Sequence, residues 1–199
     1  MRPDLVQTPP RSGLRAAVFL DRDGTLIEDR GHLASPDQMV VYPDTIPALG
    51  LLQRDFLLFI VTNQSGVAEG VISLEDAGRV NSALRSLLAA HGIELSAIYV
   101  CPHRRADNCP CIKPKPYFLH QAARDFGVDL SRSFVVGDHP HDVHLATNAG
   151  ARGVYLTTGH GIKHLHELPQ GQTVVSGIRE AAEWIFAART PATGGGEPF

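Results

Sequence analysis

The segment AAVFLDRDGTL, residues 16–26, decides how the rest of the chain is interpreted. Its apolar run ends abruptly at Asp21, which predicts a short strand buried on both faces, as in a parallel sheet covered by helices. Asp21 would then lie at the carboxyl edge, where open α/β sheets bind ligands. Asp21 and Asp23 can share a cation, and Gly24 lets the backbone turn away. The alternative is a strand that ends in a solvated Asp-Gly turn.

Composition favours one globular domain. The chain has 199 residues, 43% of them hydrophobic, and a formal net charge of −3. We expect a single domain over residues 14–189, with flexible tails at 1–13 and 190–199. The mild acidity argues against a general nucleic-acid surface, no apolar run is long enough to span a membrane, and the polar start is no secretory signal. We therefore expect a cytoplasmic monomer or small homo-oligomer without nucleic-acid or membrane partners.

Continuous apolar runs alternate along the chain with segments whose apolar residues follow helical spacing. Strands are expected at 16–20, 56–61, 97–100, 133–136, 153–156 and 173–175, and helices after 43–44 and at 73–91, 116–126, 142–149 and 178–188. The segment 26–42 has no sustained period and predicts a loop or small flap. Trp184 is expected in the core. This alternation predicts an α/β, doubly wound, Rossmann-like three-layer sandwich with a mainly parallel sheet.

Three polar strand ends would meet at one edge of this sheet. They are Asp21-Arg22-Asp23, Thr62-Asn63-Gln64 and Gly137-Asp138. Carboxylates gathered in this way form an all-oxygen site that suits Mg²⁺. A threonine hydroxyl and a lysine ammonium nearby would complete a cradle for a phosphoryl group.

All three cysteines lie close together in the sequence. Cys101, Cys109 and Cys111, with His103, offer three thiolates and an imidazole, enough to close a tetrahedral zinc shell. In a chain without an export signal, such a cluster favours metal over disulfides. A closed shell has no place for a reacting water, so the zinc would be structural and would stiffen the loop that carries Lys113. The alternative is three separate buried cysteines and an unrelated histidine.

Four motifs in order resemble those of the haloacid dehalogenase (HAD) superfamily of phosphatases. They are Asp21–Thr25, Thr62–Gln64, Lys113–Pro114 and Gly137–Asp142, and the similarity extends over about residues 18–161. The resemblance implies a HAD-like phosphoric monoester hydrolase that uses Mg²⁺ and acts on a small phosphate ester. The motifs are too close together for a large cap domain between them.

The resemblance also implies roles for single residues. Asp21 would be the nucleophile that forms an aspartyl-phosphate. Asp23 would be the general acid and then the general base, which requires a raised pKa. Thr62 and Lys113 would hold the phosphoryl oxygens, with Lys115 as the rival lysine.

The same resemblance implies a ligand set for the magnesium ion. Asp21, Asp138 and the backbone carbonyl of Asp23 would bind Mg²⁺, while Asp142 would orient the lysine or a ligand. His139 follows Asp138 directly and is a further candidate for contact with substrate, although the surface start of a helix explains it equally well.

The zinc clip makes the chain similar to a capless group that contains heptose-bisphosphate and histidinol-phosphate phosphatases. The segment 62–68 is closer to the heptose enzymes, and the spacing within the clip is closer to the histidinol enzymes. Ile112 and His139 replace an arginine and a lysine of the heptose pattern, which leaves the substrate open. Substrate contacts are expected from the loop residues Asp29, Arg30, Gly31, His32, Asn63, Gln64, Ser65 and Ile112.

Two functions of other classes fit the sequence less well. One is a nucleic-acid 3′-phosphatase, because such domains share these motifs, and the other is a non-catalytic module held together by zinc. The remaining histidines are expected to matter less. His141 and His144 have weaker claims than His139, and His160, His164 and His166 are expected on the solvated surface.

Overall fold

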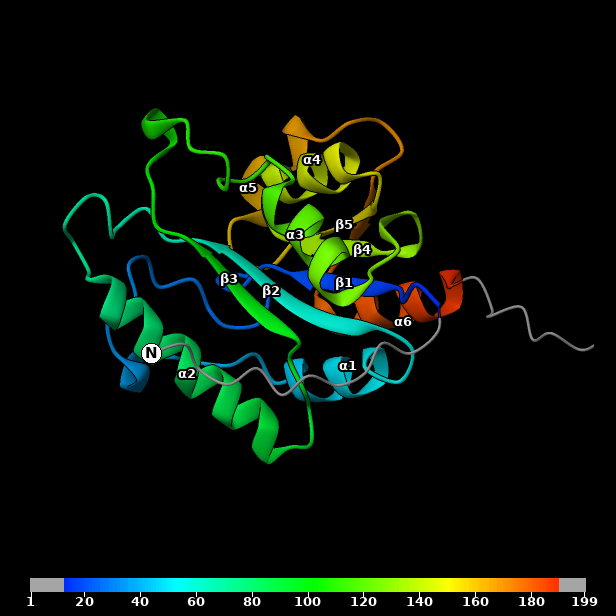
Figure 1. The fold of residues 1–199 in the computed structure, drawn as a ribbon, viewed down its shortest axis with the longest axis horizontal. Helices are drawn as coiled ribbons and strands as arrows, with labels where there is room; N and C mark the ends of the chain where they lie inside the picture. The colour runs from blue at the N-terminus through cyan, green and yellow to red at the C-terminus, as the bar shows by residue number, and fades with distance from the viewer. Residues whose placement is uncertain (1–12, 190–199) are drawn as a thin grey trace, which may run out of the picture.

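The computed structural model describes residues 13–189 (Figure 1). Apart from Gly13, the tails expected at 1–13 and 190–199 lie outside the described residues. The centre of the fold is a six-stranded parallel sheet with the strand order β3-β2-β1-β4-β5-β6. Its strands are β1 (Ala17–Leu20), β2 (Leu57–Asn63), β3 (Ala97–Cys101), β4 (Phe134–Gly137), β5 (Arg152–Leu156) and β6 (Thr173–Val175).

This topology confirms the predicted doubly wound α/β fold. The chain builds outward from β1 to β3, and then returns to add β4 on the other side of β1. The strand order therefore reverses between β1 and β4, and a crevice opens at the carboxyl ends of strands at such a point. Asp21 and Asp138 are the residues that follow these two strands.

Helices cover both faces of the sheet (Figure 1). One face packs against α1 (Thr45–Leu52), α2 (Leu74–Ala90) and α6 (Ile178–Ala188), and the other against α3 (Tyr117–Phe126) and α4 (Pro140–Ala149). The residues of β1 show that both faces of the sheet are apolar. Val18 and Leu20 belong to one core cluster and Ala17 and Phe19 to the other, and all four are fully buried.

Local signals place most helix ends as predicted. Ser73 and Asp76 form the expected capping box at the start of α2. Gly127 ends α3 in a left-handed conformation with φ +66°. Helix α4 begins two residues before the predicted Asp142, because Pro140 occupies its first turn and His139 caps it.

The shortest α-helix was not predicted from the sequence. Helix α5 (Gly161–His164) has four residues and continues into the 3₁₀ turn Leu165–Glu167. Segments of this length contain too little hydrophobic periodicity to be recognised. Trp184 is partly buried against the core and meets Phe134 edge to face, with ring centroids 6.1 Å apart.

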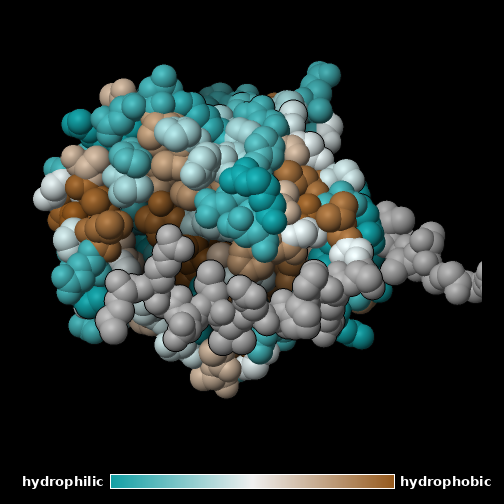
Figure 2. Space-filling view, viewed as in Figure 1, coloured by the Kyte–Doolittle hydropathy of each residue, from teal (hydrophilic) through white to brown (hydrophobic). Residues whose placement is uncertain are grey.

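The face seen in Figure 2 carries both hydrophilic and hydrophobic side chains. Hydrophobic side chains gather at its left, over the start of α2 and the loop before it, where Val71 and Leu74 are exposed. Among residues 13–189, no helix is both long and apolar enough to cross a membrane.

The capping box gives a first testable expectation. Ser73→Ala removes the oxygen that accepts the Asp76 N–H bond, so the free energy of unfolding should fall by about 1 kcal/mol. Urea unfolding measures this change. Ser86→Ala, on the exposed side of the same helix, is the matched control and should not destabilise the protein. Equal effects of the two substitutions would contradict a capping role.

Candidate active site at the carboxyl edge of the sheet

A cavity of about 180 Å³ opens at the carboxyl ends of β1, β2 and β4. Nine of the residues named from the sequence line it: Asp21, Asp23, Asp29, Thr62, Asn63, Lys113, Asp138, His139 and Asp142. The four motifs therefore meet in one place although more than a hundred residues of sequence separate the first from the last.

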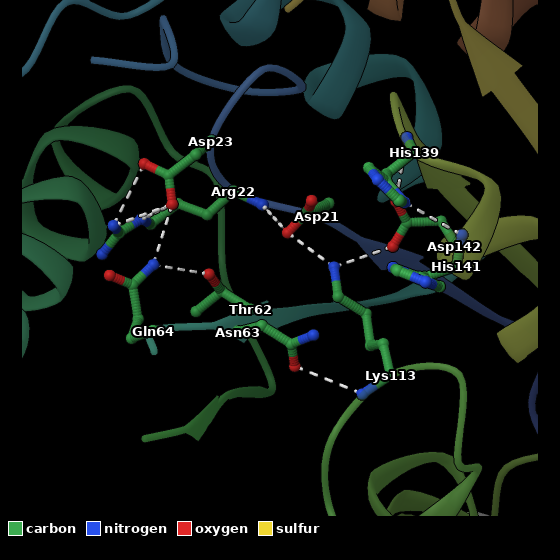
Figure 3. Close-up of polar contacts among 10 residues, drawn as sticks. All are labelled: Asp21, Arg22, Asp23, Thr62, Asn63, Gln64, Lys113, His139, His141 and Asp142. Carbon is green, nitrogen blue, oxygen red and sulfur yellow. Dashed lines mark hydrogen bonds and ion pairs between the residues drawn. The ribbon is translucent and has the colours of Figure 1, made fainter. Parts of the chain in front are cut away.

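The carboxylates of Asp21, Asp138 and Asp142 and the ammonium of Lys113 form the floor of this cavity, and Figure 3 shows Lys113 between Asp21 and Asp142. Lys113 Nζ lies 2.8 Å from Asp21 Oδ1 and 2.7 Å from Asp142 Oδ1, and its side chain is 5% exposed. Asp138 pairs with no cation among the described residues, and one of its oxygens accepts the backbone N–H of His160 at 2.7 Å. Asp21, Asp138 and Asp142 each offer an oxygen within 4.8 Å of the others.

Burial and crowding shift the protonation of this group. Burial, with Asp21 and Asp142 beside it, raises the pKa of Asp138 to about 8. Burial raises the pKa of Asp142 to about 7 against the opposing effect of Lys113. Burial alone would lower the pKa of Lys113, but its two carboxylate partners raise it above the ordinary value. The cluster holds more negative charge than one lysine neutralises, so its oxygens suit a hard divalent cation such as Mg²⁺.

Glycines leave the room that these carboxylates occupy. Gly24 has a left-handed φ of +76°, and a Cβ there would overlap the carboxylate of Asp138. A Cβ on Gly137 would overlap the carboxylate of Asp142. The backbone after β1 and at the end of β4 thus approaches the acidic side chains more closely than any other residue type allows.

Asp23 lies apart from the three carboxylates and is held by two other side chains (Figure 3). Arg22 donates from Nε and Nη2 to the two Asp23 oxygens at 3.0 Å, and Gln64 Nε2 donates to Oδ2 at 2.8 Å. Burial raises the pKa of the Asp23 carboxyl above its ordinary value, although the Arg22 guanidinium opposes the shift. A carboxyl group with a raised pKa beside a cavity suits proton transfer.

The two candidate lysines occupy different places. Lys113 points into the cavity, and its backbone N–H bonds Asn63 Oδ1 at 3.2 Å. Lys115 instead donates to Asn108 and to the carbonyl of Cys109 at 2.6–2.9 Å. Only Lys113 is placed to contact a ligand in the cavity, while Lys115 braces the cysteine loop.

Histidines form part of the cavity wall. His139 and His141 stack with ring centroids 4.2 Å apart, and His141 also accepts a bond from Arg105 of the cysteine loop. Burial lowers the pKa of His139 to about 4 and of His141 to about 3, so both rings are neutral at pH 7. His160 also lines the cavity, 3.4 Å from Asp29, although its side chain is 57% exposed.

His160 lies on the surface as predicted, but it also contributes to the cavity. It stays largely exposed, but its ring lines the cavity and its backbone N–H binds Asp138. The turn before α5 brings it there, and that short helix carried no signal in the sequence. His164, by contrast, is less exposed than predicted, with 19% of its side chain accessible and its ring centroid 4.6 Å from that of His139.

The cysteine loop has the geometry of a closed metal site. Its sulfur atoms lie 3.4–3.5 Å apart, and His103 Nδ1 is 3.7 Å from Cys101 and 3.5 Å from Cys111. A disulfide would need sulfur atoms about 2.05 Å apart. A tetrahedron of thiolates about 2.3 Å from zinc has edges slightly below 4 Å, so these four groups fit a zinc ion with little movement.

Several loop residues named for substrate contact do not line the cavity. Arg30 pairs with Glu28 on the surface, and the ring of His32 packs over Gly66. Gln64 is buried behind Asp23 and also donates to Thr62 Oγ1 at 2.8 Å. Gly31, Ser65 and Ile112 are likewise outside the set that lines it.

Two residues at this site carry no signal in the sequence. Arg22 is completely buried beside Asp23, and its Nη1 donates to Asn81 of α2 at 2.8 Å. Neither the complete burial of Arg22 nor its contact with Asn81 follows from the motif in which Arg22 lies, and Asn81 belongs to no motif. Only the fold shows that they meet.

Comparison with known proteins identifies relatives along most of the chain. Residues 110–181 match a family model described as HAD-hydrolase-like. The D-glycero-beta-D-manno-heptose-1,7-bisphosphate 7-phosphatase of Pseudomonas aeruginosa is 34% identical over 86% of this chain and 98% of its own. That of Bordetella bronchiseptica is 34% identical over 85% and 97%.

Solved structures agree with these relatives. The crystal structure of the B. bronchiseptica D,D-heptose 1,7-bisphosphate phosphatase, complexed with magnesium and phosphate, has a TM-score of 0.80 and 33% identity over 86% of this chain and 98% of that one. The corresponding enzyme of Burkholderia thailandensis has a TM-score of 0.66 and 26% identity over 88% and 100%.

The crowded carboxylates predict a stability that depends on pH. In the unfolded chain their pKa is about 3.9, whereas Asp138 titrates near 8 and Asp142 near 7 in the folded protein. Between these values the folded state binds protons that the unfolded state has released. Below about pH 6.5 the lowered pKa values of His139 and His141 act in the opposite direction, because there the unfolded state binds the protons. In magnesium-free buffer the free energy of unfolding should therefore fall mainly as pH rises from about 6.5 to about 8.

Urea unfolding at a series of pH values measures this slope. Asp138→Asn has no charge to titrate at that position and should show a shallower fall. The same slope in both proteins would mean that Asp138 is not the group responsible.

Proposed function

Since the chain belongs to the family of the D-glycero-D-manno-heptose-1,7-bisphosphate 7-phosphatases, within the HAD-like hydrolases, we propose that it releases inorganic phosphate from a small sugar phosphate. It is a phosphoric monoester hydrolase. The observation that carries the proposal is the carboxylate of Asp21 on the cavity floor, beside the buried ammonium of Lys113 and within reach of Asp138.

Asp21 acts as the nucleophile. One of its oxygens attacks phosphorus, and the bond between phosphorus and the ester oxygen breaks as the aspartyl-phosphate forms. Lys113 and Thr62 face the same cavity and hold the phosphoryl oxygens, where the ammonium offsets the charge that spreads over them. Asp142 keeps Lys113 in place through its 2.7 Å ion pair.

Asp23 carries the proton in both steps. Its protonated carboxyl gives a proton to the departing sugar oxygen, and the resulting carboxylate then takes a proton from the water that attacks phosphorus. Phosphate leaves, and Asp21 is regenerated with Asp23 protonated again. The raised pKa of Asp23 supports this role because a buried carboxyl holds its proton more readily.

Asp21 and Asp138, with the backbone carbonyl of Asp23, are the groups that would hold Mg²⁺. When bound, the ion neutralises charge on the phosphate and lets it approach the carboxylates. The excess of acidic groups over cations on the cavity floor supports this assignment.

The substrate proposed first is a heptose 1,7-bisphosphate, hydrolysed at its 7-phosphate. The sequence similarity to the P. aeruginosa enzyme, which extends over 98% of that relative, supports this substrate. Asp29, His139 and His141 form the wall beyond the phosphate, and neutral imidazoles there suit the hydroxyl groups of a sugar. Arg30, Gly31, His32, Ser65 and Ile112 do not line the cavity, and this assignment gives them no contact with the substrate.

Phosphate release from a panel of esters tests the reaction. The panel contains heptose 1,7-bisphosphate, other sugar phosphates, histidinol phosphate and a 3′-phosphorylated oligonucleotide. We expect the fastest release from a sugar phosphate, only with Mg²⁺, and only background release by Asp21→Asn. If the wild-type chain and Asp21→Asn were equally inert on every ester, the proposed activity would be wrong. A preference for histidinol phosphate or the oligonucleotide would reassign the substrate.

The clip of Cys101, His103, Cys109 and Cys111 is proposed to bind a structural zinc ion. All four side chains are used, so the site offers no open position for a reacting water. The zinc would fix the loop that presents Lys113 to the cavity and that carries Arg105 to His141.

Metal analysis of the purified protein tests this site. We expect one zinc per wild-type chain, and a clear loss of zinc and of thermal stability in Cys109→Ser. Asp21→Asn is the control and should keep its zinc. Wild-type protein that neither contains zinc nor takes it up at equimolar concentration would rule out the assignment.

A further inference from the structure

Arg22 is a charged side chain with no access to solvent. Its exposed fraction is 0%, and each of its three guanidinium nitrogens has a partner. Two of them bind the Asp23 carboxylate and the third, Nη1, binds Asn81 Oδ1 at 2.8 Å. A buried guanidinium that lost a partner would carry a large desolvation cost, so these contacts fix the orientation of the arginine.

Asn81 supplies a fixed point for this arrangement. It is 7% exposed on α2, and Val80 and Leu84 of the same helix are completely buried in the core between helix and sheet. The helix can therefore move little relative to β1. A hydrogen bond from Arg22 to Asn81 ties the residue beside Asp21 to a rigid neighbour that lies 59 residues away in the sequence.

Asp23 is consequently held from two sides. Arg22 donates hydrogen bonds to both carboxylate oxygens. Gln64 Nε2 donates to Asp23 Oδ2 and also to Thr62 Oγ1 (Figure 3). The side chain retains 16% exposure, toward the cavity that it lines. Its distance from the reacting phosphate is thus set by residues that do not line the cavity themselves.

We propose that Arg22 and Asn81 are a positioning pair that holds the Asp23 carboxyl where it can deliver a proton to the leaving oxygen. This inference rests on the proposed function. Neither residue touches the substrate, and both act through Asp23. The competing explanation is that the pair only stabilises the packing of α2 against the sheet.

The leaving group distinguishes these explanations. A sugar leaves as an alkoxide, which needs a proton as the bond to phosphorus breaks, whereas p-nitrophenolate is stable without one. Misplacing Asp23 should therefore slow the release of sugar much more than the first release of p-nitrophenol. A loss of folded protein would reduce both by the same factor.

The experiment uses Asn81→Leu, which removes the acceptor of Arg22 Nη1 at similar volume. Rapid-mixing kinetics follow the first turnover with p-nitrophenyl phosphate and with the best sugar phosphate of the panel. We expect sugar release to fall about tenfold or more, and the nitrophenol burst to change by less than about threefold because a good leaving group needs no general acid. Asn81→Asp keeps an acceptor in the same place and should restore most of the sugar release.

Two controls complete the test. Ser133→Ala removes a buried hydrogen bond to Ala17, at the amino end of the sheet, and should change both rates in equal proportion. Asp23→Asn should retain the nitrophenol burst and lose sugar release, because the proton donor itself is gone. If Asn81→Leu does not fold by circular dichroism, Arg22→Lys, which keeps the charge without the forked contact, takes its place with the same expectation.

Equal losses of both rates in Asn81→Leu, or no loss in either, would overturn the inference while the wild-type activity stands. A wild-type chain without activity on any ester would instead overturn the proposed function, and the positioning role with it.

Discussion

The ion pairs of Lys113 with Asp21 and Asp142 are the interaction on which the site depends. They join three segments that are distant in the sequence: the end of β1, the loop after β3 and the first turn of α4. An ammonium with 5% exposure is stable only with partners of opposite charge. The same carboxylates would repel one another without it. The charges therefore hold the strand ends together, and each segment is placed by the other two.

The parallel sheet makes this arrangement possible. Its order reverses between β1 and β4, which leaves a crevice at their carboxyl ends and brings Asp21 near Asp138. Strands β1 and β4 are short, fully buried and apolar, so Asp21 and Asp138 lie directly after them, whereas Thr62 and Asn63 are the last two residues of β2. The cysteine loop extends the site outward, since Arg105 reaches from the loop to His141 on the cavity wall. A zinc ion in the loop would thus affect the cavity without being part of it.

The sequence predicted most of the fold and the centre of the site because these depend on local patterns. Apolar runs such as 56–61 mark buried strands, and the polar residues that end them mark the active edge. It did not predict His160, Arg22 or Asn81 at the site. A turn without hydrophobic periodicity in its sequence brings His160 to Asp138. The contact between Arg22 and Asn81 depends on where α2 crosses the sheet. The outer loop residues Arg30 and His32 were expected near substrate because they belong to the predicted flap, but Arg30 pairs with Glu28 and the ring of His32 packs over Gly66.

The space around Asp138 has an evolutionary consequence. Gly24 and Gly159 come from loops 135 positions apart, and a Cβ on either one would overlap the same carboxylate. A larger residue at either glycine is tolerable only if the aspartate changes as well, and the positive φ of both positions favours glycine in addition. The three positions should therefore vary as a unit among homologues. In chimaeras assembled from diverged parents, a crossover between them would combine incompatible residues even where each parent is functional.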